Sequence, residues 1–211
     1  GLLVKELSLA VSAAAYALNV ICLGGAAYWL GVRRHRWTWA EFGLRPVPWS
    51  WLMLGVVVTV GLLPLRAAVG LAAQWLSGGL EGMQFRMDML APGAISWPSF
   101  FITLLGAGLL APVAEEFYFR GLIHRWFQSR FTFWPRVLLS SAIFALGHID
   151  TPGVVAASFI MGLVLAAAYD YSRSLWVPIT IHIFNNGLAV GLLYAILALM
   201  RLFPSLAGGW P

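Results

Sequence analysis

Hydrophobic segments as long as a bilayer-spanning helix are the main constraint on how this chain can fold. Such a helix needs roughly 20 mostly apolar residues, and the few charges here fall at segment ends or in pairs. Only 10% of the 211 residues are charged, against roughly 25% in a soluble domain. Because a backbone in lipid must satisfy its own hydrogen bonds, the segments are predicted to be helices. Six are expected, at residues 7–32, 52–75, 98–130, 136–149, 152–169 and 176–200.

The connections between these segments are short and contain no visible repeat. We therefore expect one all-α domain over residues 1–211, a polytopic transmembrane bundle with a buried polar cavity. Residues 1–97 would contribute two N-terminal spans, and residues 98–200 carry the polar motifs. Most of the eleven tryptophans lie near segment ends, as in an interfacial aromatic belt. The single cysteine, Cys22, excludes a disulfide framework and a cysteine-based metal site.

The charge distribution predicts an orientation in the membrane. Thirteen Lys and Arg residues exceed eight acidic ones, for a net charge of +5, and this balance suits membrane topology rather than nucleic-acid binding. Arginines gather after the first segment and around the third-to-fourth connection, which are therefore expected in the cytoplasm. The connection carrying Glu81, Arg86 and Asp88 is net acidic and is expected on the other side, with both termini. The abundance of arginine over lysine suggests a prokaryotic plasma membrane.

Two adjacent carboxylates, Glu115 and Glu116, lie inside the third segment. A charge at membrane depth costs at least about 2.5–3.5 kcal/mol, so such groups usually line a cavity or a pathway. Arg120 follows Glu116 by one helical turn and is expected to pair with it. Glu115 points about 100° away and is left as a candidate general base. The alternative interpretation is a buried Glu–Arg clamp between helices, with a spare carboxylate.

Two histidines lie on later segments. His148 ends the fourth segment one turn after Phe144, and by itself it could be an ordinary histidine at a helix end. His182 lies in the sixth segment with Asn186 one turn later, so that an imidazole and a carboxamide share one helix face. Taken alone, this pair could be an interhelical hydrogen bond.

A depth estimate brings these groups together. At a helical rise of about 1.5 Å per residue, Glu115 lies about 22 Å and His148 about 18 Å from the arginine-rich boundary. Counted from Arg173, His182 lies about 13 Å and Asn186 about 20 Å deep on the same scale. Polar groups from three helices are therefore predicted to meet in one cavity that opens toward the cytoplasmic face.

Three motifs on successive segments carry a resemblance to a known family. They are Glu115-Glu116-x-x-x-Arg120, Phe144-x-x-x-His148 and His182-x-x-x-Asn186. In this order they resemble the motifs of the CPBP (CAAX protease and bacteriocin-processing, or Abi) intramembrane proteases, which include the Rce1-like prenyl-protein endopeptidases. The resemblance covers about residues 98–188.

The resemblance implies hydrolysis of a peptide bond within the membrane by a glutamic-type protease. Glu115 would act as general base with His148, so that the two hold and deprotonate the attacking water. Glu116 and Arg120 would orient this base from behind. No cofactor would be needed.

His182 and Asn186 would donate hydrogen bonds to the oxyanion of the tetrahedral intermediate, each worth about 2.7–4 kcal/mol in a dry site. A zinc-dependent version of the same protease is an alternative, with Glu115, His148 and His182 as the three protein ligands that catalytic zinc commonly has. We favour the metal-free site, because the sequence has no His-Glu-x-x-His helix and because the last motif suits paired oxyanion donors.

Two other functional classes could use the same polar residues. A proton-coupled transporter would relay protons through them, but it predicts inverted repeats or paired broken helices, which are not visible. A noncatalytic scaffold or immunity protein would use the bundle for binding. For the protease, the expected partners are membrane lipid and a protein or peptide substrate, such as a lipidated tail, a leader peptide or a sorting signal. Arg66 is expected to snorkel toward the interface or to neutralise a substrate carboxylate.

Overall fold

The computed structural model describes residues 2–77, 83–92 and 95–203, and every regular element in these ranges is a helix. Five helices in this part of the chain are long and apolar enough to cross a membrane. They are Ser8–Arg34, Trp49–Leu76, Trp97–Gln128, Pro152–Ser172 and Trp176–Leu202. They correspond to five of the six predicted segments, which confirms the all-α transmembrane fold.

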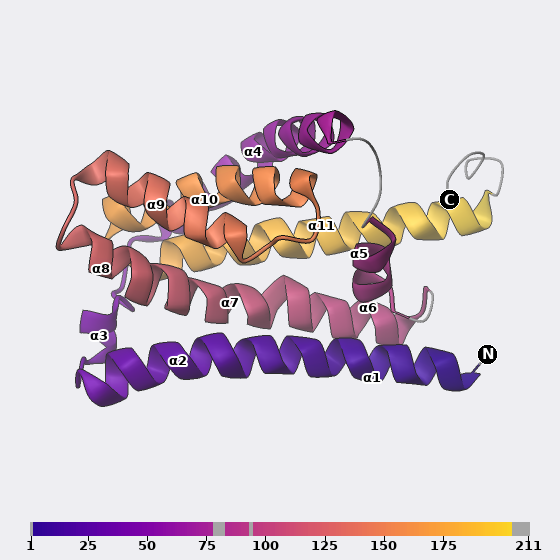
Figure 1. Ribbon diagram of the computed structural model, residues 1–211, viewed down its shortest axis with the longest axis horizontal. Helices are drawn as coiled ribbons and strands as arrows, with labels where there is room; N and C mark the ends of the chain where they lie inside the picture. Colours follow the sequence, from indigo (N-terminus) through magenta and orange to yellow (C-terminus); the bar gives the residue numbers. More distant parts are fainter. Residues whose placement is uncertain (1, 78–82, 93–94, 204–211) are drawn as a thin grey trace.

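The remaining predicted segment, at residues 136–149, forms the shorter helix α9 (Phe133–Leu146). Its 14 residues reach about 21 Å at 1.5 Å per residue, less than the roughly 30 Å of a bilayer's hydrocarbon core. Helix α9 therefore ends part-way along the bundle, and residues 147–151 lead from it into α10 (Pro152–Ser172) (Figure 1).

The first and third spans are each built from several helical pieces, with π-helical turns labelled η. The first comprises α1 (Leu2–Asn19), η1 (Val20–Gly24), α2 (Gly25–Ala27) and η2 (Tyr28–Arg34). The third comprises α6 (Trp97–Thr103), η3 (Leu104–Leu110), α7 (Ala111–Glu116), η4 (Phe117–His124) and α8 (Arg125–Gln128). Pro112 explains the change of pitch before α7, because a proline inside a helix removes a donor and crowds the preceding turn. The carboxylate-bearing α7 is thus flanked by widened turns, which often mark functional sites.

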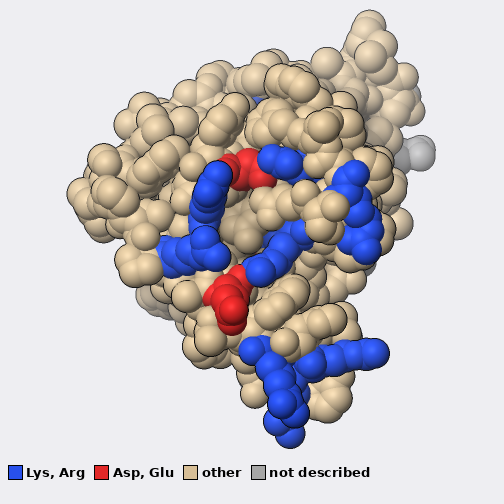
Figure 2. Space-filling model, turned by 90° about the vertical axis from the view of Figure 1, so that its left-hand side faces the viewer, with Lys and Arg blue, Asp and Glu red and all other residues tan. Residues whose placement is uncertain are grey.

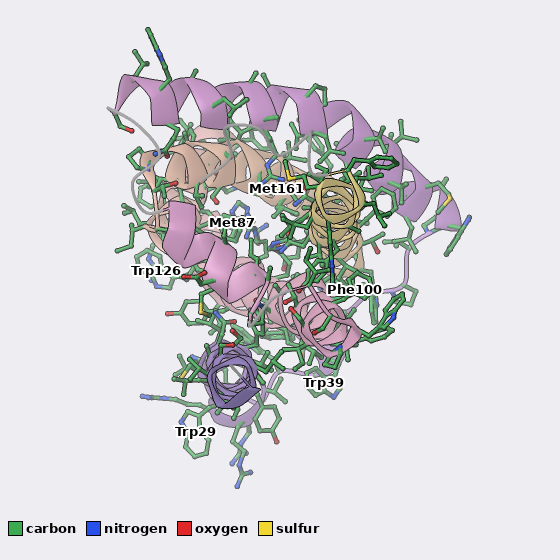
Figure 3. All side chains as sticks on the ribbon, turned by 90° about the vertical axis from the view of Figure 1, so that its right-hand side faces the viewer. Trp29, Trp39, Met87, Phe100, Trp126 and Met161 are labelled. Carbon is green, nitrogen blue, oxygen red and sulfur yellow. The ribbon has the colours of Figure 1, made fainter. Side chains whose placement is uncertain are left out.

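The other elements complete the bundle. They are α3 (Trp39–Phe42), α4 (Trp49–Leu76), α5 (Met83–Leu90) and α11 (Trp176–Leu202). The first span and α4 lie at opposite edges, with α7, α9, α10 and α11 between them (Figures 1 and 3). Helix α10 packs against α9 and α4, and α11 packs against α4 and η3. Helix α7 also packs against α11, and α9 against η4, so side chains of these segments can meet inside the bundle.

Glycines allow the closest helix crossings. A Cβ added at Gly162 of α10 would lie 2.9 Å from the Cα of Ser141 on α9, and one at Gly106 would lie 2.3 Å from a ring carbon of Tyr16. Such distances are shorter than packed carbon atoms adopt. The two crossings bring α9 against α10 and the first span against the third.

The two ends of the bundle differ in character. Helix α1 begins and α11 ends at the same end, whereas α3 and α8 lie at the other (Figure 1). Arginines gather at the α3 and α8 end (Figure 2). The start of α1 and the end of α11 thus lie opposite the arginine-rich loops. Of the predicted acidic connection, Glu81 lies outside the described residues, and Asp88 belongs to α5.

Large apolar side chains cover much of the outside of the bundle. Trp29 and Trp126 point outward and are 59% and 53% exposed, whereas Met161 points inward and is 2% exposed (Figure 3). An exterior of this kind suits lipid rather than water, because soluble proteins rarely expose large continuous apolar patches. The polar residues of interest lie instead in the interior.

Candidate active site

Three segments position the predicted site residues. Glu115 and Glu116 lie in α7, and His148 lies in the turn that follows α9. His182 and Asn186 lie one turn apart on α11. The structure brings both glutamates and both histidines into one cluster. Asn186 lies beside this cluster and lines a hollow together with Glu115 and His148.

Glu116 is fully buried and bonds two partners. Its Oε1 accepts a hydrogen bond from Arg120 Nη1 at 3.1 Å and another from His182 Nδ1 at 2.8 Å. Arg120, also fully buried, donates from Nη2 to the carbonyl oxygen of Gly162 at 3.2 Å and lies 4.5 Å above the ring of Phe144. The expected Glu116–Arg120 pair is therefore present. Its contact with His182 was not anticipated, because the two residues are 66 positions apart.

Glu115 lies between the two imidazoles. Its Oε2 is 3.8 Å from His148 Nε2 and 3.7 Å from His182 Nε2. Both distances exceed a direct hydrogen bond of about 2.7–3.2 Å. This oxygen is buried and has no hydrogen-bond partner among the described residues. A buried carboxylate oxygen usually has a hydrogen-bond donor within reach, and here the two imidazoles are the polar groups beside it.

The hydrogen-bond partner of each Nδ1 shows which nitrogen of the ring carries the proton. His148 Nδ1 lies 2.9 Å from the carbonyl oxygen of Phe144, which can only accept, so this nitrogen carries a proton. His182 Nδ1 likewise donates to the carboxylate of Glu116. In the neutral form of each ring, Nε2 is then the nitrogen with a free lone pair. Both imidazoles therefore present a proton acceptor toward Glu115.

Asn186 is held by a chain of hydrogen bonds that crosses the bundle. Arg66 Nη1 donates to Asn185 Oδ1, and Asn185 Nδ2 donates to Asn186 Oδ1 at 2.8 Å. Asn186 Nδ2 in turn donates to the carbonyl oxygen of Ala107 at 3.0 Å. Arg66 also donates from Nε to the carbonyl oxygen of Ala157 at 3.2 Å. The expectation that Arg66 snorkels is therefore wrong: its guanidinium turns into the bundle because carbonyl and carboxamide oxygens there accept its hydrogen bonds.

Sequence reasoning missed Asn185 as part of this chain. The adjacent asparagines were a signal, since two carboxamides in a row within an apolar helix need partners. Only one of them lies on the His182 face, however, and the partner of the other is on a different helix.

Two hollows border Glu115 and His148. One of about 310 Å³ also touches Tyr16, Met89 and Asn186, and one of about 420 Å³ also touches Cys22. The predicted polar cavity is thus present. It was expected to open toward the arginine-rich end, but neither hollow is lined by α3 or α8. The second hollow meets the exposed Cys22 instead, so it opens along the side of the first span.

The zinc alternative requires side chains that are arranged to hold a metal ion. Among the described residues, no group of three His, Cys, Asp or Glu side chains is arranged to hold a metal ion. Glu115 lies near both His148 and His182, but these three side chains are not arranged as a metal site.

Comparison with known proteins places the chain in a family. A family model described as "Type II CAAX prenyl endopeptidase Rce1-like" matches residues 97–188, which include all three motifs. The chain belongs to this Rce1-like family of membrane proteases. This Rce1-like chain is 31% identical to an uncharacterized 24.3 kDa protein of Escherichia coli over 156 residues, which cover 72% of the chain and 66% of that protein.

A second relative of this Rce1-like chain is the membrane-embedded CAAX protease MroQ of Staphylococcus aureus. The two are 34% identical over 100 residues, which cover 43% of the chain and 37% of MroQ. The chain thus spans about two thirds or less of the length of the curated relatives described here. No solved structure matches it.

Proposed function

We propose that this chain is an intramembrane endopeptidase in which Glu115 and His148 activate a water molecule. The observation that supports this is the position of Glu115 Oε2, which is 3.7 Å from one imidazole Nε2 and 3.8 Å from the other. One water can lie about 2.8 Å from both Glu115 Oε2 and His148 Nε2, the ordinary length of a hydrogen bond, and so bridge the two groups. The hollows beside Glu115 leave room for a peptide to approach that water.

In the proposed reaction, the water oxygen attacks the carbonyl carbon of the scissile peptide bond. Glu115 takes a proton from the water as the new C–O bond forms, and His148 holds the water through Nε2. The tetrahedral intermediate then breaks its C–N bond, and the departing amine takes the proton from Glu115. The products are a carboxylic acid and an amine, with the side chains restored.

Stabilisation of the oxyanion is assigned to His182 and Asn186. His182 can donate from Nε2 only as an imidazolium, because its Nδ1 already donates to Glu116. Asn186 keeps one amide hydrogen after its bond to Ala107. Glu116 and Arg120 would fix the orientation of His182 from behind.

The proposed substrate is a protein or peptide tail that reaches the site from the bilayer. The hollow at Cys22 is also lined by Leu18, Leu23 and Phe119, so an apolar segment could enter through it. The family name and that of MroQ favour a CAAX-type tail among the substrates considered, which also include leader peptides and sorting signals. We place the arginine-rich end in the cytoplasm of a prokaryotic plasma membrane.

The central test is replacement of Glu115 by Gln. We expect the E115Q variant to remain folded and to lose about 10²–10⁴-fold in kcat, because general-base catalysis contributes about that much. The measurement is cleavage of a quenched fluorescent, farnesylated CAAX peptide by the protein in lipid nanodiscs. E41Q serves as the control. It removes a carboxylate from α3, at the arginine-rich end of the bundle, and should cleave normally. Full turnover by folded E115Q would refute the assignment of the base.

Metal dependence is tested separately. The metal-free proposal predicts that the purified protein contains less than stoichiometric zinc and that chelation leaves the cleavage rate unchanged. Elemental analysis by mass spectrometry and the same peptide assay provide the two measurements. Stoichiometric zinc, with activity lost on its removal and restored on its return, would favour the alternative in which Glu115, His148 and His182 bind the metal.

A further inference from the structure

A second polar hollow lies at the arginine-rich end of the bundle. It has a volume of about 330 Å³, within the range of small-ligand sites, and Figure 2 shows arginines around a depression on this face. Its lining consists of Glu41, Gly43, Arg45, Arg125, Gln128, Arg136, Tyr169, Asp170 and Arg173. We call it the arginine hollow. It shares no lining residue with the two hollows beside Glu115.

Four guanidinium groups reach the arginine hollow from four parts of the chain. Arg45 follows α3, Arg125 begins α8, Arg136 lies in the first turn of α9, and Arg173 follows α10. Only two carboxylates, those of Glu41 and Asp170, line the same space. The lining therefore carries a net charge of about +2, by the ordinary charges of these groups at neutral pH.

Asp170 is already fully engaged. Its Oδ1 accepts hydrogen bonds from Gln128 Nε2 at 2.7 Å and lies 3.1 Å from His124 Nε2. Its Oδ2 accepts from Arg136 Nε at 2.8 Å. This carboxylate pairs with Arg136, and none of these contacts joins it to Arg45, Arg125 or Arg173.

Glu41 is engaged in a helix cap. Its Oε2 accepts from the backbone N–H and the hydroxyl of Thr38, each at 2.8 Å. These two bonds, followed by attraction to Arg125 and Arg45, hold the pKa of Glu41 below its ordinary value. Glu41 is thus charged at neutral pH, and its Oε2 is bonded to Thr38.

The other three arginines have no carboxylate within salt-bridge distance in the part of the chain that the structure describes. Arg45 donates from Nε to the carbonyl oxygen of Ala40 at 2.9 Å, and Arg125 stacks 4.2 Å from the ring centre of Trp37. Arg125 is also hydrogen-bonded to the hydroxyl of Tyr169, a neutral partner that leaves its positive charge unbalanced. Four positive charges that share two carboxylates still repel one another, so a bound anion would stabilise this arrangement.

Arg173 lies in a backbone conformation that suits glycine. Its φ of 53° and ψ of 28° are left-handed, at the position that ends α10. Helices commonly use glycine there, because other residues pay a steric cost of roughly 1–2 kcal/mol. An arginine at this position accepts that cost while adding a fourth guanidinium to the hollow.

We propose that the arginine hollow binds a phosphate group, carried by an anionic lipid or present as free phosphate. A phosphate group carries up to about two negative charges, which matches the excess charge of the lining. Guanidinium groups bind phosphate oxygens through paired hydrogen bonds, better than other cations do. The hollow also lies at an end of the membrane spans, where lipid phosphates are found. The inference does not depend on the proposed peptidase activity.

The test compares two arginines of equal charge and similar backbone conformation. Arg36 also has a left-handed φ, of 56°, at the same end of the first span, but it does not line the hollow. R173G and R36G therefore remove the same charge and the same backbone strain. With inorganic phosphate titrated into protein in neutral detergent at constant ionic strength, R173G is expected to bind at least about tenfold more weakly than wild type, the loss typical of one charge-assisted hydrogen bond. R36G should bind like wild type.

A second pair of variants separates charge from backbone freedom. R173Q and R36Q keep a side chain in the left-handed conformation and remove only the charge. R173Q should weaken phosphate binding as R173G does, and R36Q should not. Equal binding by the Arg173 and Arg36 variants of either pair would overturn the proposal, because binding would then follow net charge alone.

The source of the phosphate is distinguished by a lipid arm of the experiment. Wild type, R173G and R36G are placed in phosphatidylcholine nanodiscs with or without phosphatidylglycerol, and retained lipid is measured by native mass spectrometry. Retention of phosphatidylglycerol that depends on Arg173 but not on Arg36 assigns a lipid headgroup. Arg173-dependent binding of inorganic phosphate alone assigns the free anion. If neither probe binds in an Arg173-dependent way, the hollow is not a phosphate site.

Discussion

Glu116 shows how a single buried carboxylate can set the chemistry of its neighbours. By accepting from both Arg120 and His182, it keeps a charge neutralised inside the bundle and at the same time fixes the ring orientation of His182. A histidine whose Nδ1 is held in this way presents Nε2 to the reacting atoms. The role of His182 therefore depends on a residue that would never touch the substrate.

Asn185 is predicted to matter for catalysis although it does not border the hollows at Glu115. It links Arg66 to Asn186, so its loss would free the Asn186 carboxamide to rotate away from the oxyanion. We expect N185A to lower kcat about tenfold or more with little change in KM, since a displaced oxyanion donor weakens the transition state more than the bound substrate. Steady-state cleavage of the CAAX peptide measures both constants.

A matched variant separates this positioning role from a structural one. N185D keeps the oxygen that accepts from Arg66 but loses the amide that donates to Asn186. If positioning of Asn186 is what matters, N185D loses kcat as N185A does. Normal kcat in N185D would show that only the anchoring of Arg66 is required.

At the scale of elements, the crossing of α9 and α10 supports the buried charges. Gly162 lets α10 approach Ser141 of α9, and its carbonyl oxygen accepts the hydrogen bond from Arg120. Without this close approach, the fully buried guanidinium of Arg120 would lose a hydrogen-bond partner. The small residue in α10 thus serves the charge pair on the third span.

Replacement of Gly162 by Ala is predicted to destabilise the bundle. The added Cβ would lie 2.9 Å from Ser141 Cα, so the helices must separate, at a cost of about 1–3 kcal/mol. Thermal unfolding in detergent should show a lower Tm for G162A. In G61A the added Cβ meets nothing within 4 Å, so this control should unfold at or above the wild-type temperature. Equal Tm values for G162A and the wild type would contradict the packing argument.

At the scale of the whole molecule, the distribution of polar groups separates three regions. Apolar side chains cover the outside, the glutamates and histidines meet in the interior, and arginines gather at one end. This pattern is typical of a protein that uses lipid as its solvent and keeps intramembrane charge for function. It also predicts an orientation, because arginine-rich ends stay in the cytoplasm.

Cysteine labelling tests that orientation. In a C22A background, R34C places a thiol at the arginine-rich end of the first span, and F203C places one just after α11 at the other end. With a membrane-impermeant maleimide on intact spheroplasts, we expect F203C to be labelled and R34C to be labelled only after permeabilisation. The reverse pattern would invert the proposed topology.

Local patterns in the sequence were enough to predict part of this protein. The apolar segments predicted helices, because lipid requires a backbone that satisfies itself. The spacing of Glu116 and Arg120 predicted their pair, because residues one turn apart on a helix are neighbours whatever the rest of the fold. The order of the motifs indicated the family, and the depth estimate brought Glu115, His148 and Asn186 to similar levels.

The contacts that cross between helices were decided by the tertiary structure. The bond from His182 to Glu116, the chain from Arg66 to Asn186 and the arginine hollow each join segments far apart in the sequence. Whether such residues meet depends on how each helix is rotated and how closely it packs, and those variables are set by glycines and bulky side chains on the partner helices. A single strand of sequence contains the residues for these contacts, but only the packed bundle determines which of them meet.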